Sequence, residues 1–108
     1  LSHVQTGEVT IAVQDAHFDG IEVRAGDTIG LLNDRLTAKG ADSDAVVEEL
    51  LKQMNAAELE IITLYYGQPV TEKQAQALQA RLRQLFPDQE CEVVNGGQPF
   101  YHYIISAE

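Results

Sequence analysis

The pattern that most limits the fold of this chain is a strand, a helix and a second strand that follow one another in its second half. Residues 60–66 form a nearly continuous apolar run, which is typical of a central strand covered on both faces. Thr71, with Gln74 three positions later, fits a capping box at the start of a helix, and Pro87 ends that helix. Residues 90–94 alternate again as a strand. We therefore predict a βαβ unit with two parallel strands.

Residues 95–108 are unusually strand-like for a terminal segment. They contain two adjacent glycines, a proline, three aromatic rings within four positions and an apolar run that reaches the last residue. Termini are usually frayed and polar, so this composition predicts a segment fixed in a sheet. Residues 100–106 should pair antiparallel with a neighbour, because the loop before them is too short for another helix. The glycines are the best candidate for a contact surface, because backbone without side chains can approach a partner closely.

Residues 7–40 read as an antiparallel β meander. Val9, Ile11 and Val13 alternate with polar residues, as in a half-buried strand. Turn signals then recur at short intervals, at Asp19-Gly20, residues 25–27 and Asn33-Asp34. Turns this close together require short antiparallel strands between them.

A first helix is predicted from Ser43 to Asn55. Asp42 is suited to cap it, since its carboxylate can accept a hydrogen bond from a free backbone amide of the first turn. One face of the helix carries an apolar stripe at helical spacing, made up of Val46, Val47, Leu50, Leu51 and Met54. We expect this stripe to pack in the core rather than to form a ligand groove.

The predicted fold class is therefore mixed α/β (α+β). An N-terminal antiparallel β meander over residues 7–40 precedes a helix, the βαβ unit and a C-terminal antiparallel strand over residues 41–108. This gives two main helices in a single domain, residues 1–108, which is long enough for a hydrophobic core. Because the chain opens at Leu1 rather than at a methionine, we expect it to be the C-terminal part of a larger protein.

The charge of the chain argues against several classes of partner. Its 17 acidic and 7 basic residues give a net charge of −10, and neither sign is clustered. Nucleic acids and anionic membranes both require a dense basic surface, so neither is expected as a partner. No apolar run reaches the ~18 residues of a membrane span. Cys91 is the only cysteine, which excludes an internal disulfide and fits a reducing, cytoplasmic location.

The sequence offers little for catalysis or metal binding. His3, His17 and His102 lie in unrelated segments without metal-ligand spacing. His17, near Asp15 and Asp19, is better explained by a solvated turn than by a metal site. His102 alternates with two tyrosines, so it should face away from them, as a hydrogen-bonded strand histidine rather than a proton-transfer group. The sequence contains no phosphate-binding loop, dinucleotide fingerprint, nucleophile elbow or zinc-type cysteine pair.

The carboxyl ends of the two parallel strands are the best place for a binding surface. Tyr65 and Tyr66 end one strand and residues 95–97 follow the other, so both reach the same rim. Tyrosine is a frequent interface anchor, because it combines a large apolar area with one polar tip. The alternative is that at least one ring packs in the core. The turn could also form an anion nest, but no lysine or arginine lies within ten residues, so a structural turn is the better interpretation.

Two motifs at this rim carry a resemblance to a bacterial protein family. Residues 61–67 end in Tyr-Tyr-Gly, and residues 92–106 contain Gly-Gly-Gln-Pro followed by aromatic residues. Together they resemble the C-terminal domain of the DAK2-domain (dihydroxyacetone-kinase-like) proteins, whose characterised members are the A subunit of fatty acid kinase. Residues 6–13 and 20–27 are similar to the segment just upstream in that family. The resemblance thus covers nearly the whole chain.

The resemblance implies a division of labour between domains and subunits. In that family an N-terminal helical domain binds ATP and magnesium, and a separate DegV-like subunit carries the fatty acid. Together they form acyl phosphate, which enters phospholipid synthesis. This chain contains neither the nucleotide domain nor the lipid carrier, so we expect no cofactor and no catalysis in this fragment. The parent is expected to be an ATP-dependent fatty acid (DAK2-type) kinase, and no catalytic residue of the family has a counterpart here.

We therefore interpret the chain as a docking domain that holds a DegV-like fatty-acid-binding protein beside the parent's own kinase domain. The predicted contact residues are Tyr65, Tyr66, Gly67, Asn95, Gly96, Gly97, Gln98 and Tyr101. A bulky replacement of Gly96 or Gly97 should weaken pairing and leave the fold largely intact, provided that neither glycine needs a positive φ. Two other interpretations stay open: a small-molecule sensor with a pocket at the same rim, and a structural or homodimerisation domain. A closed pocket with buried polar groups would favour the sensor, whereas a flat aromatic patch would favour docking.

Overall fold

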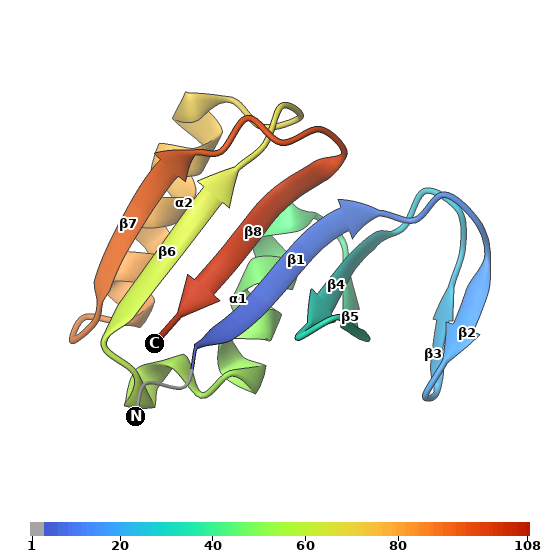
Figure 1. The fold of residues 1–108 in the computed structure, drawn as a ribbon, viewed down its shortest axis with the longest axis horizontal. Coiled ribbons are helices and arrows are strands. Elements are labelled where there is room, and N and C mark those ends of the chain that lie inside the picture. Colours follow the sequence, from blue (N-terminus) through green and yellow to red (C-terminus); the bar gives the residue numbers. More distant parts are fainter. Residues whose placement is uncertain (1–3) are drawn as a thin grey trace.

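A six-stranded sheet with helices against one face makes up most of the structure, a computed structural model that describes residues 4–108 (Figure 1). The first half contains β1 (Gln5–Ile11), β2 (Ala16–Phe18), β3 (Ile21–Val23), β4 (Thr28–Leu32), β5 (Arg35–Gly40) and α1 (Ser43–Gln53). The second half contains the 3-10 helix η1 (Ala56–Glu58), β6 (Ile61–Tyr66), α2 (Glu72–Leu85), β7 (Glu90–Asn95) and β8 (Tyr101–Ala107). The predicted mixed α/β class is confirmed, with two main helices within residues 4–108. His3 lies outside the described residues.

The strands of the main sheet lie in the order β5-β4-β1-β8-β6-β7. β6 and β7 are parallel, with Tyr66 opposite Asn95 at their carboxyl ends. The other neighbouring strands pair antiparallel. The predicted βαβ unit is therefore confirmed, with α2 between its strands, and so is the antiparallel last strand. Because β8 lies between β1 and β6, it joins the two halves of the sheet.

Both helices begin where the sequence predicts, because side chains cap their first turns. Asp42 Oδ1 accepts a hydrogen bond from the Ala45 amide at 2.8 Å, ahead of α1. Thr71 and Gln74 form the predicted capping box at α2, in which each side chain accepts from the other's backbone amide at 3.1 and 2.9 Å. These bonds satisfy amides that a helix start otherwise leaves unpaired. The end of α1 comes at Gln53, two residues before the predicted one.

Both helices cover the same face of the sheet, and the core lies between them and the strands (Figure 1). The expectation that residues 60–66 are covered on both faces is wrong, because alternate residues of β6 are buried and Tyr65 is 36% exposed. A continuous apolar run arises here because one side faces the core while the other belongs to an uncovered apolar surface. The largest fully buried side chains are Val9, Val46, Val47, Leu50, Leu51, Ile62, Leu64, Leu78, Leu82, Tyr103 and Ile105.

The first half of the chain departs from a simple meander. β2 and β3 form a separate two-stranded hairpin, and β1 pairs with β4 instead of β2. The turns at Asp19-Gly20 and Asn33-Asp34 are confirmed, and both residues of each turn have positive φ, as a type I′ turn requires. The predicted alternation runs too far, because β1 ends at Ile11 and Val13 is 92% exposed.

An irregularity in β8 changes the direction of His102. Val9 lies opposite Tyr103, whereas the next residue, Thr10, lies opposite Tyr101, so His102 is an extra residue in β8. Such a bulge interrupts the alternation of side chains along a strand. His102 and Tyr103 consequently line the same pocket. The prediction that His102 faces away from both tyrosines is therefore wrong for Tyr103.

Candidate functional site

The carboxyl ends of β6 and β7 meet at the predicted rim, but bonds within the protein occupy its amide groups. The backbone amides of Gly96 and Gly97 both donate to the carbonyl oxygen of Tyr66, at 2.9 and 3.2 Å. Because these donors are already paired, they are not available to an anion. The turn is structural, as the sequence favoured.

The loops after β6 and β7 are also bound to each other. The Gln98 side-chain amide donates to the carbonyl of Tyr65 at 2.8 Å, and the Gly67 amide donates to the carbonyl of His102 at 2.9 Å. Gly67 is buried, and a Cβ atom placed there would collide with the carbonyl oxygen of Tyr101. Close backbone packing, rather than an accessible contact surface, accounts for glycine at this position.

Gly96 and Gly97 are exposed but cannot be replaced freely. Gly97 has a φ of +66°, so any other residue there adopts the strained left-handed conformation. A Cβ on Gly96 would collide with Oε1 of Gln98 and lie 3.1 Å from Cβ of Tyr65. The prediction that bulky replacements leave the fold largely intact required that neither glycine needs a positive φ. Gly97 does not meet this condition, so a bulky residue at that position would affect the fold as well as any contact.

The two rim tyrosines point to opposite faces of the sheet. Tyr66 is 9% exposed and belongs to the core, whereas Tyr65 is on the uncovered face. The alternative that at least one ring is a core residue thus describes Tyr66. Among the predicted contact residues, Tyr65, Asn95, Gly96 and Gly97 are exposed, Gln98 and Tyr101 are partly exposed, and Tyr66 and Gly67 are buried.

The uncovered face of the described sheet carries a largely apolar row of side chains that crosses every strand from β7 to β5. By register, it consists of Val94, Tyr65, Ile104, Glu8, Leu31 and Leu36, each opposite the next. We call these residues the open-face row. Glu8 is its one charged member; burial raises the pKa of Glu8, and the neighbouring Asp34 carboxylate raises it further. An uncovered apolar surface of this kind is typical of a protein contact.

Phe100 projects from the loop before β8, with 80% of its surface exposed. Its φ is +71°, and the Tyr101 amide donates to the carbonyl of Pro99 at 2.8 Å, so Phe100 is the central residue of a γ-turn. The sequence reasoning placed Phe100 in a strand and did not single out Val94. Alternation with Glu92 marks Val94 as facing the open side, whereas no sequence signal indicates the positive φ of Phe100.

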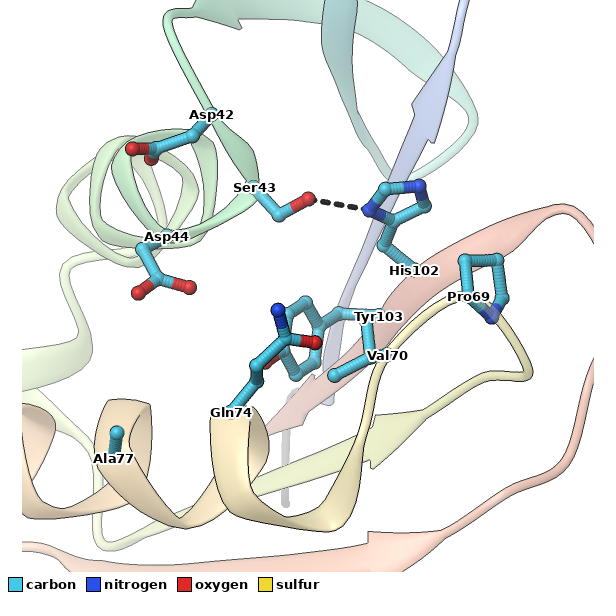
Figure 2. Close-up of a pocket in the computed structure, with 9 residues that line it drawn as sticks. All are labelled: Asp42, Ser43, Asp44, Pro69, Val70, Gln74, Ala77, His102 and Tyr103. Atoms are coloured by element: carbon cyan, nitrogen blue, oxygen red, sulfur yellow. Dashed lines mark hydrogen bonds between the residues drawn. The ribbon is translucent and has the colours of Figure 1, made fainter.

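A pocket of about 370 Å³ lies on the covered side of the sheet, between the first turns of α1 and α2 (Figure 2). On its wall, Oγ of Ser43 is 2.5 Å from Nδ1 of His102. The sensor interpretation places a pocket at the rim, but none of the predicted rim residues lines this one. Its lining residues are Asp42, Ser43, Asp44, Pro69, Val70, Gln74, Ala77, His102 and Tyr103.

Burial shifts the titration of three pocket side chains. It raises the pKa of Asp44, and repulsion by the Asp42 and Glu48 carboxylates adds to the effect. Burial also lowers the pKa of His102 and raises that of Tyr103. Both shifts favour the uncharged form of the ring, because a buried charge loses its hydration. The pocket thus combines a neutral imidazole and a neutral phenol with two carboxyl groups.

The described residues contain no evident metal site. Within residues 4–108, no three His, Cys, Asp or Glu side chains come close enough together to hold a metal ion. His17 is largely exposed, with Nδ1 3.8 Å from Oε1 of Glu22, and Asp15 accepts a hydrogen bond from the Ala25 amide at 2.9 Å. His17 is solvent-exposed as expected, but it lies in strand β2, opposite Glu22, rather than in a turn. None of the helices in this part of the chain has the length and hydrophobicity needed to cross a membrane.

The fold and these surfaces define a small mixed α/β domain with an uncovered sheet face and a pocket between its two helices. Over residues 1–108 the sequence matches the FakA-like family, which comprises the C-terminal domains of proteins similar to the A subunit of fatty acid kinase. The chain belongs to this family. The resemblance inferred from the rim motifs is confirmed at that level.

Curated relatives extend well beyond the matched region. The chain is 35% identical over 108 residues to Protein YloV of Bacillus subtilis (strain 168). It is 34% identical over 108 residues to an uncharacterised protein of Staphylococcus aureus (strain USA300). Each match covers 100% of this chain and 20% of the relative, so the chain spans about a fifth of the length of these proteins.

Proposed function

We propose that this chain is a docking domain of a fatty-acid-kinase-like protein and binds a DegV-like fatty-acid carrier subunit. The carrier would be held beside the parent's own kinase domain, where ATP and magnesium bind. The acyl carboxylate would then be phosphorylated there, and the acyl phosphate would supply phospholipid synthesis in the cytoplasm. The chain itself contributes contact surface rather than catalysis. Membership of a fatty acid kinase family supports the link to this reaction.

The observation that carries the proposal is the open-face row together with Phe100. Val94 is 42% exposed and lies opposite Tyr65 in the register. Apolar surface that stays in contact with water is unfavourable by roughly 25 cal/mol per Å², and a partner that covers it recovers this free energy. Aromatic anchors of this type commonly dominate protein interfaces.

The rim residues would form the polar border of the same contact. Asn95, Gly96 and Gly97 are exposed at the end of β7, next to Val94 of the row. Gly67, which is buried, would act indirectly by holding the two loops together. Tyr66 would do the same through the carbonyl that accepts both glycine amides.

Charge indicates what the partner surface should look like. The chain has a net charge of −10, and Glu90 and Glu92 are exposed on β7 beside the row. A complementary partner therefore needs an apolar patch with a basic border, since like charges across an interface are strongly unfavourable. The same argument opposes a homodimer through this face, which would bring two acidic copies together.

Calorimetric titration of a purified DegV-like carrier into this chain, and into the full-length protein, tests the proposal. Val94→Lys should weaken binding by about tenfold or more, as expected when a charge enters an apolar contact. Leu85→Lys is the matched control, because Leu85 is 45% exposed but lies on α2, outside the row. Carrier binding by the full-length protein but not by the folded chain would contradict the proposal. Light scattering of the chain alone distinguishes a dimerisation domain.

A further inference from the structure

The wall of the pocket between α1 and α2 contains a hydroxyl group that has no partner among the described residues. Tyr103 is 1% exposed and lines the pocket. Its hydroxyl has no hydrogen-bond partner among residues 4–108. In this part of the chain, every fully enclosed polar side-chain atom does have a partner. The small accessible area of Tyr103 therefore includes its hydroxyl, which opens into the pocket. A hydroxyl that opens into the pocket can donate to and accept from a molecule bound there.

Other side chains present hydrogen-bonding groups to the same space (Figure 2). Oε1 of Gln74 accepts from the Thr71 amide, which leaves the side-chain N–H groups of Gln74 free to donate. The His102 ring also lines the pocket, with its Nδ1 paired with Oγ of Ser43. Asp44 offers a carboxylate from the first turn of α1. Donors and acceptors thus converge from both helices and from β8.

This set of groups selects a chemical class of ligand. An anion would be repelled by the carboxylates of Asp42 and Asp44. A simple ammonium ion has no acceptor for the donors of Gln74 and Tyr103. A hydroxyl group both donates and accepts, so it suits a carboxylate, an amide and a phenol.

We propose that this pocket binds a small, uncharged polyhydroxylated compound, such as a polyol or a sugar. Asp44 accepts hydrogen bonds from its hydroxyl groups, while Gln74 and Tyr103 donate to its oxygens. The volume of about 370 Å³ lies at the lower end of the range for small-molecule sites, which limits the size of the compound. The ligand and a partner on the open-face row would occupy opposite faces of the sheet, so this inference stands independently of docking.

Amide chemical shifts of the nitrogen-15-labelled chain test the inference in titrations with glycerol, ribose and glucose. At least one of these probes should produce saturable shifts at Ser43, Asp44 and Gln74. Putrescine and inorganic phosphate serve as charged probes and should bind more weakly. No saturable shift with any of the three polyhydroxylated probes, or tighter binding of either charged probe, would overturn the proposal.

Substitutions then locate the site. Asp44→Asn and Tyr103→Phe should each weaken binding by about tenfold, because each removes one hydrogen-bonding group and preserves the shape of the side chain. Glu49→Gln removes an exposed acid of α1 outside the pocket and should leave affinity unchanged. Affinity equal to that of the unmodified chain in both Asp44→Asn and Tyr103→Phe would show that binding occurs elsewhere.

Discussion

Ser43 and His102 lie 59 positions apart in the sequence, yet Oγ of one is 2.5 Å from Nδ1 of the other. The contact joins the first turn of α1 to the bulge in β8. It depends on the bulge, because regular alternation would direct His102 to the other face of the sheet. The half-buried ring has a lowered pKa because burial disfavours its charged form.

The stability of the chain should therefore respond to protonation of His102. The folded state binds this proton less readily than the unfolded state, whose histidine titrates near the ordinary pKa of 6.5. The neutral ring contributes its full stability above pH 6.5. This contribution is lost as the pH falls from 6.5 through the lowered pKa of the folded state. Urea unfolding measures the stability of the unmodified chain and of His102→Asn. As the pH falls, the unmodified chain should lose stability relative to His102→Asn. A difference that stays constant with pH would contradict this.

Glu8 should have the opposite pH dependence. It lies between Leu31 and Ile104 in the open-face row, and both burial and Asp34 raise its pKa. A raised pKa means that the protonated form is favoured in the folded state, so its contribution is present below the ordinary value of 4.5 and is lost as the pH rises through the folded pKa.

Replacement of Glu8 by glutamine should consequently stabilise the chain at neutral pH. The gain should be about 0.5 kcal/mol, since the site is partly exposed and screened by solvent. The gain should disappear below pH 4.5, where both side chains are uncharged. Glu90→Gln, at an exposed position of β7, is the matched control for denaturant unfolding. Equal effects of the two substitutions at neutral pH would show that the row does not destabilise the Glu8 carboxylate.

Phe100 combines strong exposure with a positive φ, so its side chain contributes little packing to offset backbone strain. A positive φ costs an L-residue about 1–2 kcal/mol, and glycine avoids this cost but loses more entropy on folding. Phe100→Gly should thus raise the free energy of unfolding by about 0.5 kcal/mol while weakening binding of the carrier. Val13→Gly removes another exposed side chain without relief of strain, and should lower stability instead. Unchanged carrier affinity in Phe100→Gly would exclude Phe100 from the contact.

Gly67 and Gly97 should differ in their tolerance of alanine. A Cβ at Gly67 would collide with the Tyr101 carbonyl and lie 2.6 Å from the Gln98 carbonyl, so two backbone segments would have to move. Gly67→Ala should cost about 3 kcal/mol or more. Gly97→Ala should cost about 1 kcal/mol, because its surroundings are open and only its φ of +66° is unfavourable. Thermal unfolding of both variants compares them directly, and similar losses would rule out close approach as the reason for glycine at position 67.

Features that depend on neighbouring residues could be predicted from the sequence. The cap at Asp42 and the capping box of Thr71 and Gln74 are each defined within a few positions, and both helices begin as expected. The turn at Asp19-Gly20 is equally local. Convergence of Tyr66 and Asn95 at one edge could also be predicted, because the carboxyl ends of adjacent parallel strands always meet.

Features that depend on distant packing could not be predicted in this way. The run at residues 60–66 does not reveal which face the helices cover, because α1 and α2 pack on the same side. The bulge at His102 is defined only when β8 is paired with β1. The pocket escaped notice because Ser43, Gln74 and Tyr103 come from three segments with no common motif. The amides of Gly96 and Gly97 are paired with the carbonyl of Tyr66, which lies some thirty positions earlier in the sequence.

The central position of β8 also has a kinetic consequence. Neither half of the chain forms a complete sheet by itself, because β8 pairs with β1 on one side and with β6 on the other. In the register, Gln5 lies opposite Ala107, so folding must close a loop that spans nearly all the described residues. Closure of long loops loses chain entropy before the contacts form, which slows folding relative to helical proteins of similar size. We therefore expect β8 amides to exchange hydrogen only through unfolding of the whole sheet, because opening this one strand separates both halves.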